Sequence, residues 1–209
     1  LQGAVVLDVA ERADAALQAV LRQLHWGIGW IETLFLRKRS LDDARTLQRA
    51  RDALDVLAVA GGQARLPAMA MAVVNDLAGR FACNRVALGI DRHGRARLLA
   101  LSHSAFFEKK SQFVAALENA MDEALDQRRS IAFPPVDEGS GPIAIAHRDF
   151  AANRAVCSVV LASRGIGVGV ISFERGTPFD GEEIAGFEAV STLLGPLFES
   201  RIELHRWFA

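Results

Sequence analysis

The residues from Arg154 to Arg175 read Arg-Ala-Val-Cys-Ser-Val-Val-Leu-Ala-Ser-Arg-Gly-Ile-Gly-Val-Gly-Val-Ile-Ser-Phe-Glu-Arg. Two apolar runs rich in β-branched residues meet at a glycine-containing turn, which is the pattern of two antiparallel strands joined by a tight connection. Because both runs are apolar, we expect this hairpin to lie in the interior of a sheet with helices packed on it.

The segments on either side of the hairpin supply the rest of an α+β domain. Alternating apolar residues predict strands over 85–91 and 96–102, and a short strand over 130–133 stops at two prolines. Helical spacing predicts helices over 67–81, 111–127 and 180–207, and a short helical turn over 145–150. The sequence therefore predicts a central antiparallel sheet of five or six strands flanked by helices.

The first 62 residues are predicted to form an N-terminal helical hairpin, with the sheet domain over 63–209. An apolar helical stripe runs from Val9 to Phe35, and Arg37-Lys-Arg39 supplies charges that suit a helix C-terminus. Ser40-Leu-Asp-Asp43 is typical of the start of a second helix, which Gly61-Gly62 ends.

Composition excludes several functional classes. The chain has 209 residues, 51% apolar and 23% charged, with a formal net charge of -1 and no basic block. Nucleic acid is therefore not an expected partner, because neutralisation of phosphates dominates such binding. Two cysteines in unrelated contexts indicate neither a disulfide framework nor a zinc site. No apolar run has the length of a membrane span. Because the first residue is Leu, we expect a piece of a longer protein.

The order of predicted elements and several motifs resemble GAF domains over about residues 66–202. The run Asn75 to Gly89 resembles the first GAF helix and strand. Val156–Leu161 and Gly167–Glu174 resemble the last strand pair, and Pro178–Glu183 resembles the start of the closing helix. The resemblance implies a GAF-like fold, a fold that hosts many functions.

A narrower resemblance concerns three short pieces, Leu24–Glu32, Leu101–Phe107 and Ala124–Gln127. They are similar to a bacterial group in which a GAF domain precedes a transmembrane helix and a membrane-fusion adaptor of efflux or type I secretion. The resemblance implies a cytoplasmic head that ends at Trp207, at the inner face of the membrane. The membrane would then be reached only through parts of the protein outside this chain.

Ligand-binding GAF domains hold small molecules between the sheet and the helices and loops over one face. The resemblance places there nine candidate residues: Ser102, His103, Ser104, Phe106, Phe107, His147, Phe150, Cys157 and Ser158. Hydrogen-bonding groups beside aromatic walls are the mixture that small-molecule pockets use. The competing interpretation is that His103 is satisfied by the backbone and that the two phenylalanines are core residues.

Other chemistry receives less support from the residues. His147 with Asp149 could bind a metal or relay protons, but two such residues at that separation are far from a complete site and favour a solvated position. Cys157 lacks the motif around a bilin attachment, which favours a buried small hydrophobe. Phe179-Asp180 lacks the Asn-Lys of the cyclic-nucleotide signature. We predict no catalytic residues, no metal and no cofactor.

The terminal helices are the predicted oligomer contacts. Trp26 and Trp30 are spaced to share one helix face. The apolar residues of the last helix, Leu194, Phe198 and Ile202 among them, follow a period close to seven over almost its whole length. Such stripes favour packing against helices of the same chain or of a partner over membrane insertion. A homodimer through the terminal helices is the expected partner.

The sequence leaves three functional hypotheses. The first is a non-catalytic regulatory module that binds a small ligand or mediates dimer assembly, in an adaptor or as the input domain of a signalling protein. The second is a ligandless scaffold with a closed core. The third is an enzyme such as the methionine-sulfoxide reductases built on a GAF fold, which the small number of cysteines disfavours.

Overall fold

The computed structural model describes residues 6, 8, 10, 13–104, 108, 111–136 and 141–207. The chain divides into two compact units, Leu1–Gln48 and Arg49–Ala209. The elements follow in the order α1 (Asp14–Gly61), α2 (Leu66–Arg80), β1 (Arg85–Asp91), β2 (Ala96–Leu101), α3 (Gln112–Gln127), β3 (Ile131–Phe133), α4 (Ile145–Ala151), β4 (Ala155–Ser163), β5 (Ile166–Arg175) and α5 (Gly181–Trp207).

The predicted N-terminal hairpin is replaced by one continuous helix of 48 residues, α1. Ser40 and the aspartates after it lie inside α1. In a helix interior each such residue lowers helix stability by only about 0.5 kcal/mol relative to alanine. No proline interrupts the segment, and Thr46 donates its hydroxyl to the carbonyl of Asp42 within the helix. A cap signal without a helix breaker did not suffice to end the first helix.

The five strands of the described residues form one antiparallel sheet in the order β2-β1-β5-β4-β3. The central hairpin is confirmed, because β5 is the middle strand and β4 lies beside it. Arg164 and Gly165 connect the two strands with positive φ angles of 51° and 79°, as a tight hairpin turn requires.

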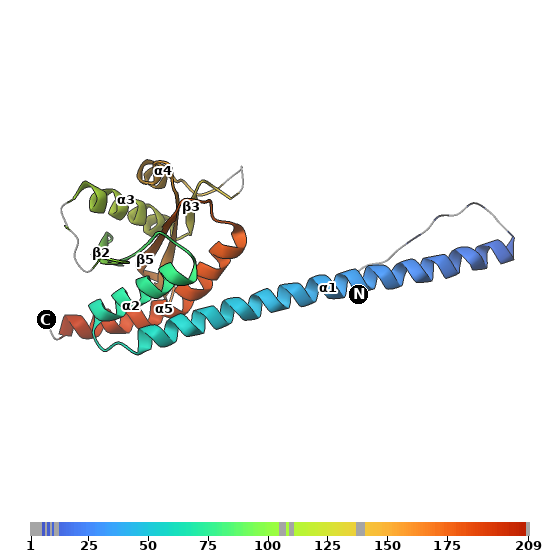
Figure 1. Cartoon of the computed structure of the whole chain (residues 1–209), viewed down its shortest axis with the longest axis horizontal. Coiled ribbons are helices and arrows are strands. Elements are labelled where there is room, and N and C mark those ends of the chain that lie inside the picture. Colours follow the sequence, from blue (N-terminus) through green and yellow to red (C-terminus); the bar gives the residue numbers. More distant parts are fainter. Residues whose placement is uncertain are drawn as a thin grey trace. The chain divides into compact units, whose positions relative to one another are not determined.

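Helices cover both faces of the sheet (Figure 1). On one face, α2, α5 and the last turns of α1 bury an apolar core in which the rings of Phe173 and Phe187 stack with centroids 3.9 Å apart. Ala53, Val56 and Ala60 of α1 belong to this core, so residues 49–61 pack with the sheet domain, beyond the predicted boundary.

The opposite face carries α3 and α4, and a second apolar cluster lies beneath them. α3 approaches the sheet closely at Gly89, where a Cβ atom would lie 2.8 Å from the sulfur of Met121. Small residues in the strands therefore set the distance between α3 and the sheet on this face.

The last helix begins as predicted and packs on its own domain. Asp180 accepts the backbone N–H of Glu183 at 2.8 Å, and Glu183 accepts the N–H of Asp180 at 3.0 Å, which is a capping box. Leu194 and Phe198 are fully buried in the core, and Ile202 is half-buried. Leu194 and Phe198, predicted as oligomer or helix-packing contacts, therefore pack within their own domain and leave no free surface for a partner. Among the described residues, no helix combines the length and hydropathy that a membrane span requires.

Candidate functional site

Two serines mark the centre of the sheet face that α3 and α4 cover. Ser158 of β4 pairs in register with Ser172 of β5, and their hydroxyl oxygens lie 2.6 Å apart. Both side chains are buried. Hydroxyl groups in a buried layer cost free energy unless hydrogen bonds satisfy them, and each serine retains further capacity to accept.

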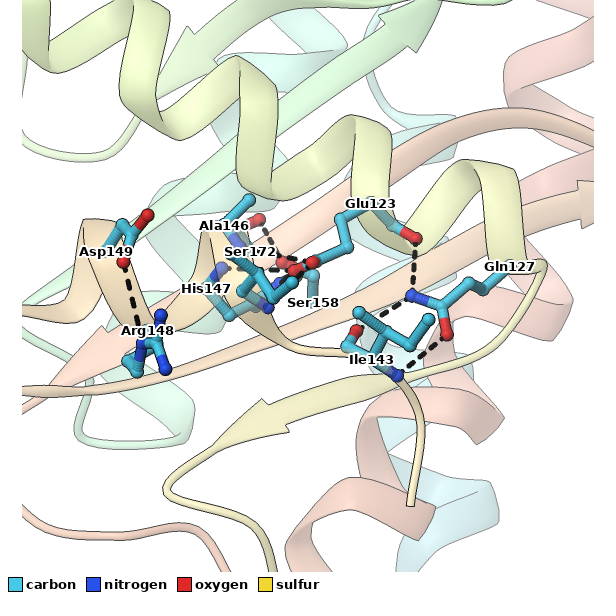
Figure 2. Close-up of polar contacts among 10 residues, drawn as sticks. Glu123, Gln127, Ile143, Ala146, His147, Arg148, Asp149, Ser158 and Ser172 are labelled. Carbon is cyan, nitrogen blue, oxygen red and sulfur yellow. Dashed lines mark hydrogen bonds and ion pairs between the residues drawn. The ribbon is translucent and has the colours of Figure 1, made fainter. Parts of the chain in front are cut away.

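His147 of α4 and Glu123 of α3 complete a polar cluster over these strands (Figure 2). The imidazole is fully buried, and its Nδ1 atom lies 2.8 Å from Oε2 of Glu123. The same carboxylate accepts the backbone N–H groups of Ile145 at 2.7 Å and of Ala146 and His147 at 3.1 Å. Glu123 therefore fixes both the first turn of α4 and the orientation of the His147 ring.

Electrostatics define the protonation of this pair. Burial lowers the pKa of His147, and the hydrogen bond and charge of Glu123 only partly oppose that effect. Burial tends to raise the pKa of Glu123, but the hydrogen bonds from His147 and the backbone N–H groups outweigh it and hold the pKa below its usual range. The pair is therefore a carboxylate that accepts a hydrogen bond from the Nδ1–H group of a neutral imidazole.

The other ring nitrogen of His147 has no partner. Among the described residues, Nε2 of His147 is the buried side-chain nitrogen or oxygen that lacks a hydrogen bond. In the neutral ring with Nδ1 protonated, Nε2 is an acceptor. A buried acceptor without a donor calls for a specific explanation, such as a bound molecule.

A pocket of about 300 Å³ opens between α3 and α4 on the outer side of this cluster. Its walls combine three polar side chains with small, aliphatic and aromatic ones: Ala116, Asn119, Glu123, Ile145, Ala146, Asp149 and Phe150. Glu123 belongs to both the pocket and the buried cluster. Glu123 thus lines the pocket and also contacts His147.

Further contacts hold α3 in place beside the pocket. Asp122 accepts the backbone N–H of Ala96 at 2.5 Å, and Glu118 accepts that of Leu98 at 2.9 Å. Both N–H groups belong to β2, the edge strand of the sheet. Side chains of α3 therefore satisfy an edge that would otherwise be unpaired.

A charged and aromatic cluster closes one end of the site. Glu174 is buried. Its carboxylate accepts hydrogen bonds from the guanidinium group of Arg85, at 3.1 Å, and from that of Arg154. The Arg85 guanidinium lies 4.5 Å from the ring centroid of Phe113, and Phe113 contacts Phe150 with centroids 5.6 Å apart. These contacts tie the start of α3 and the end of α4 to the sheet.

A larger cleft of about 590 Å³ lies elsewhere, near the turn between β4 and β5. Its charged walls include the exposed Arg128 and Arg129, while Glu188 accepts the hydroxyl of Ser130 at 2.6 Å. Among the described residues that line this cleft, none has a buried polar side-chain atom without a hydrogen bond, so we place the candidate site between α3 and α4.

The predicted site residues fall in different places. His147, Phe150 and Ser158 lie together on the face covered by α3 and α4. The structure corrects the expected solvated position, because His147 is fully buried in a helix, whereas Asp149 is exposed and paired with Arg148. Cys157 points to the opposite face, into the core under α2 and α5.

The segment after β2 is held by backbone contacts. The hydroxyl of Ser102 accepts the N–H of Val86 at 2.9 Å. His103 is exposed, has a φ of 59°, and donates its backbone N–H to Asn75 at 2.9 Å. Ser104 forms an isolated bridge with Leu101. Phe106 and Phe107 lie outside the described residues.

Sequence reasoning missed Glu123, Ser172 and Asn119. Glu123 lies next to Ala124, a residue of the predicted apolar face of that helix. A carboxylate beside a core position was the signal in the sequence that could have identified Glu123. The role of Ser172 could not be predicted, because its pairing with Ser158 depends on a register shift between Leu161 and Ala162.

Two remaining predictions concern α1 and metals. Trp26 and Trp30 are exposed, at 76% and 66%. Their role in helix packing stays a prediction. In the part of the chain that the structure describes, no group of three or more histidine, cysteine or acidic side chains is arranged to hold a metal ion.

Comparison with known proteins identifies the fold. No family model matches the chain. No curated protein matches it either. Among solved structures, the GAF domain of a phosphoenolpyruvate-protein phosphotransferase from Acinetobacter is similar with a TM-score of 0.57 at 12% identity, over 76% of this chain and 98% of that one. The A. Aeolicus nlh2 GAF domain in an inactive state gives 0.53 at 14% identity, over 75% and 99%.

An enzyme is also similar. The free methionine-R-sulfoxide reductase from Neisseria meningitidis, in complex with its substrate, gives a TM-score of 0.54 at 15% identity, over 73% of this chain and 89% of that one. Identities at this level establish the fold and leave activity open. The chain therefore has the α+β fold of GAF domains, with a five-stranded antiparallel GAF-like sheet.

Proposed function

We propose that this chain is a regulatory module that binds a small molecule between α3, α4 and the sheet. The observation that carries the proposal is the fully buried Nε2 atom of His147, which has no hydrogen-bond partner. A bound molecule that donates a hydrogen bond to this nitrogen removes the cost of the unpaired acceptor.

The chemistry of the site limits the ligand. Nε2 accepts, and each serine hydroxyl retains capacity to accept, so the ligand needs an N–H or O–H group. A pocket of about 300 Å³ suits a compact molecule, at the lower end of the sizes that ligand sites have. The similar reductase from Neisseria meningitidis is described with its substrate bound, which supports small-molecule binding in this fold.

Glu123 links ligand binding to a change in structure. Its side chain lines the pocket, and its carboxylate holds the first turn of α4 through three N–H groups. A ligand that competes for this carboxylate in the pocket displaces it, and α4 then loses its tie to α3. The ligand shifts the population of the two arrangements by its difference in affinity for them.

The test is capture of small molecules from an extract of the host. The purified protein is incubated with the extract and washed by ultrafiltration, and the retained molecules are identified by mass spectrometry. Ala116→Trp fills the pocket, and Ala115→Trp, at an exposed position of the same helix, is the matched control. We expect a molecule retained by the wild type and by Ala115→Trp and lost in Ala116→Trp. Equal retention by all three proteins, or by none, contradicts the proposal.

We propose that the module is not an enzyme. Both thiols lie in the core, and burial raises the pKa of Cys83 to about 11 and that of Cys157 further still. Thiols held protonated are poor nucleophiles, which argues against cysteine chemistry of the reductase kind. Reversible oxidation of either cysteine during methionine sulfoxide reduction, detected by mass spectrometry, would overturn this part.

We also propose the cytoplasmic head of a membrane-anchored efflux or secretion adaptor as the setting of this module. The support is the resemblance of Leu24–Glu32, Leu101–Phe107 and Ala124–Gln127 to that bacterial group. In fractionated host cells, the protein that carries this chain should sediment with the inner membrane. Its GAF-like part should resist protease added to spheroplasts. Recovery in the soluble fraction, or cleavage from outside, contradicts this setting.

A ligandless scaffold is the second candidate, and one observation favours it. Glu123 already satisfies three N–H groups of the first turn of α4, as a permanent internal tie would. On this alternative the extract yields no bound molecule, and a buried water satisfies His147.

A further inference from the structure

The N-terminal unit carries an apolar seam along α1. Large apolar side chains alternate at spacings of four and three residues: Leu17, Leu21, Leu24, Ile28, Ile31 and Phe35. This is the a and d pattern of helices that pair along their length. Five of the six are exposed, from 41% for Leu17 and Ile28 to 54% for Leu21 and Phe35.

The seam has no cover in the described part of the chain. Neither apolar cluster of the described residues contains a residue before Ala53. An isolated helix does not hold a continuous apolar stripe in water without a partner surface, because such a stripe stabilises a helix only when it is packed.

We infer that this seam pairs with the same seam of a second copy of the chain, antiparallel and centred on residue 26. Opposite positions of the two helices are then Leu17 with Phe35, Leu21 with Ile31, Leu24 with Ile28, and Asp14 with Lys38. All three apolar layers are matched, and each end of the seam closes with an ion pair. A two-fold axis makes every contact occur twice.

Charge and size distinguish this arrangement from a parallel one. In a parallel pair in register, Asp14 would face Asp14 and Lys38 would face Lys38 along the seam, which is unfavourable. The flanking positions agree with the antiparallel choice. Along one edge of the seam, Val20 lies diagonally across from Leu34 and Gly27 diagonally across from Gly27 of the second copy, where the absence of a side chain lets the helices approach.

The inference does not depend on the proposed ligand site, since it uses residues of the first unit alone. Trp26 and Trp30 fall on other faces of α1 than the seam. The predicted homodimer is thereby assigned to an aliphatic seam, and the two tryptophans are outside it.

The first test is the mass of the particle in solution. Analytical ultracentrifugation of the whole chain at micromolar concentration should give a dimer. Ile28→Asp should give a monomer, and Gln23→Asp, the same charge change at an exposed position off the seam, should stay dimeric. Circular dichroism verifies that both variants keep their helices. A monomeric wild type, including one that binds only other proteins or membranes, overturns the inference, as does a dimer that survives Ile28→Asp.

The second test determines the direction of the pair by disulfide trapping. Leu21→Cys alone should form little covalent dimer under mild oxidation, because Leu21 faces Ile31. The double variant Leu21→Cys with Ile31→Cys should be trapped efficiently. The unaltered protein is the control, since Cys83 and Cys157 are buried. Efficient trapping of Leu21→Cys alone indicates a parallel pair and overturns the antiparallel assignment.

The third test uses the ion pairs at the ends of the seam. Asp14→Lys should weaken the dimer several-fold at low salt, and adding Lys38→Asp should restore it. In a parallel pair, Asp14→Lys only exchanges one like-charge contact for another. An unchanged dissociation constant for Asp14→Lys therefore contradicts the proposed register.

Discussion

Oε2 of Glu123 lies 2.8 Å from Nδ1 of the fully buried His147, and this contact joins α3 to α4 above the centre of the sheet. Replacing the carboxylate in Glu123→Gln removes charge-assisted hydrogen bonds to the ring and to α4. The free energy of unfolding should fall by about 1–3 kcal/mol in urea denaturation. Asp149→Asn, a matched change at an exposed residue near the same pocket, should stay within about 0.5 kcal/mol of wild type. Equal free energies of unfolding for the two variants would show that the contacts of Glu123 do not contribute to stability.

His147 should make stability depend on pH below neutrality. Because burial lowers the pKa of His147, the unfolded chain binds a proton below about pH 6.5 that the folded chain does not. This contribution to stability is complete above that pH and is lost as the pH falls. The decrease in Tm from about pH 7.5 to about pH 5.5 should therefore be smaller in His147→Gln than in wild type. His205→Gln, at an exposed site, should behave as wild type. A steeper decrease in His147→Gln would reverse the assigned sign.

Gly195 of α5 should tolerate no side chain. A Cβ atom there would overlap the carbonyl oxygen of Ala162 in β4, and a backbone atom cannot swing aside as a side chain can. Gly195→Ala should cost about 1–3 kcal/mol of stability. Gly79→Ala, in α2 with open space around the new methyl, should instead stabilise by about 0.5–1 kcal/mol. Chemical denaturation of both variants checks the pair, and a neutral Gly195→Ala would contradict the close packing of α5 on β4.

The two cysteines should be unreactive in the folded protein. Burial raises the pKa of Cys83 to about 11, and Cys157 is fully buried with its pKa raised further. Little thiolate exists at neutral pH, so modification by Ellman's reagent should be slow in buffer and fast in urea. Cys83, at 7% exposure, should react before Cys157. Rapid labelling of either thiol without denaturant would contradict the burial described.

Most of the sheet domain could be predicted from sequence because its signals are local. The alternation in β1 and β2, the capping box of Asp180 and Glu183, and the turn at Arg164-Gly165 each depend on a few neighbouring residues. The position of Ser40 inside a continuous helix could not be predicted in this way. A residue that suits a helix cap is also tolerated inside a helix when no helix breaker follows it.

The candidate site was predicted only in part because it depends on long-range register. His147 and Ser158 were named, but their partners Glu123 and Ser172 were not. Regular pairing from the hairpin turn would set Ser158 opposite Ile171, and the shift between Leu161 and Ala162 sets it opposite Ser172 instead. The contact between Glu123 and His147 requires the placement of α4 on α3, which no local pattern encodes.

The central claim is that the space between α3, α4 and the sheet binds a small molecule through His147. Native mass spectrometry of the protein purified from its own host, compared with Ala116→Trp prepared in the same way, tests it most directly. The account predicts a small-molecule adduct on the wild type that Ala116→Trp lacks. Wild-type protein whose mass equals that of the polypeptide alone, and which stays so after exposure to host extract, would contradict it.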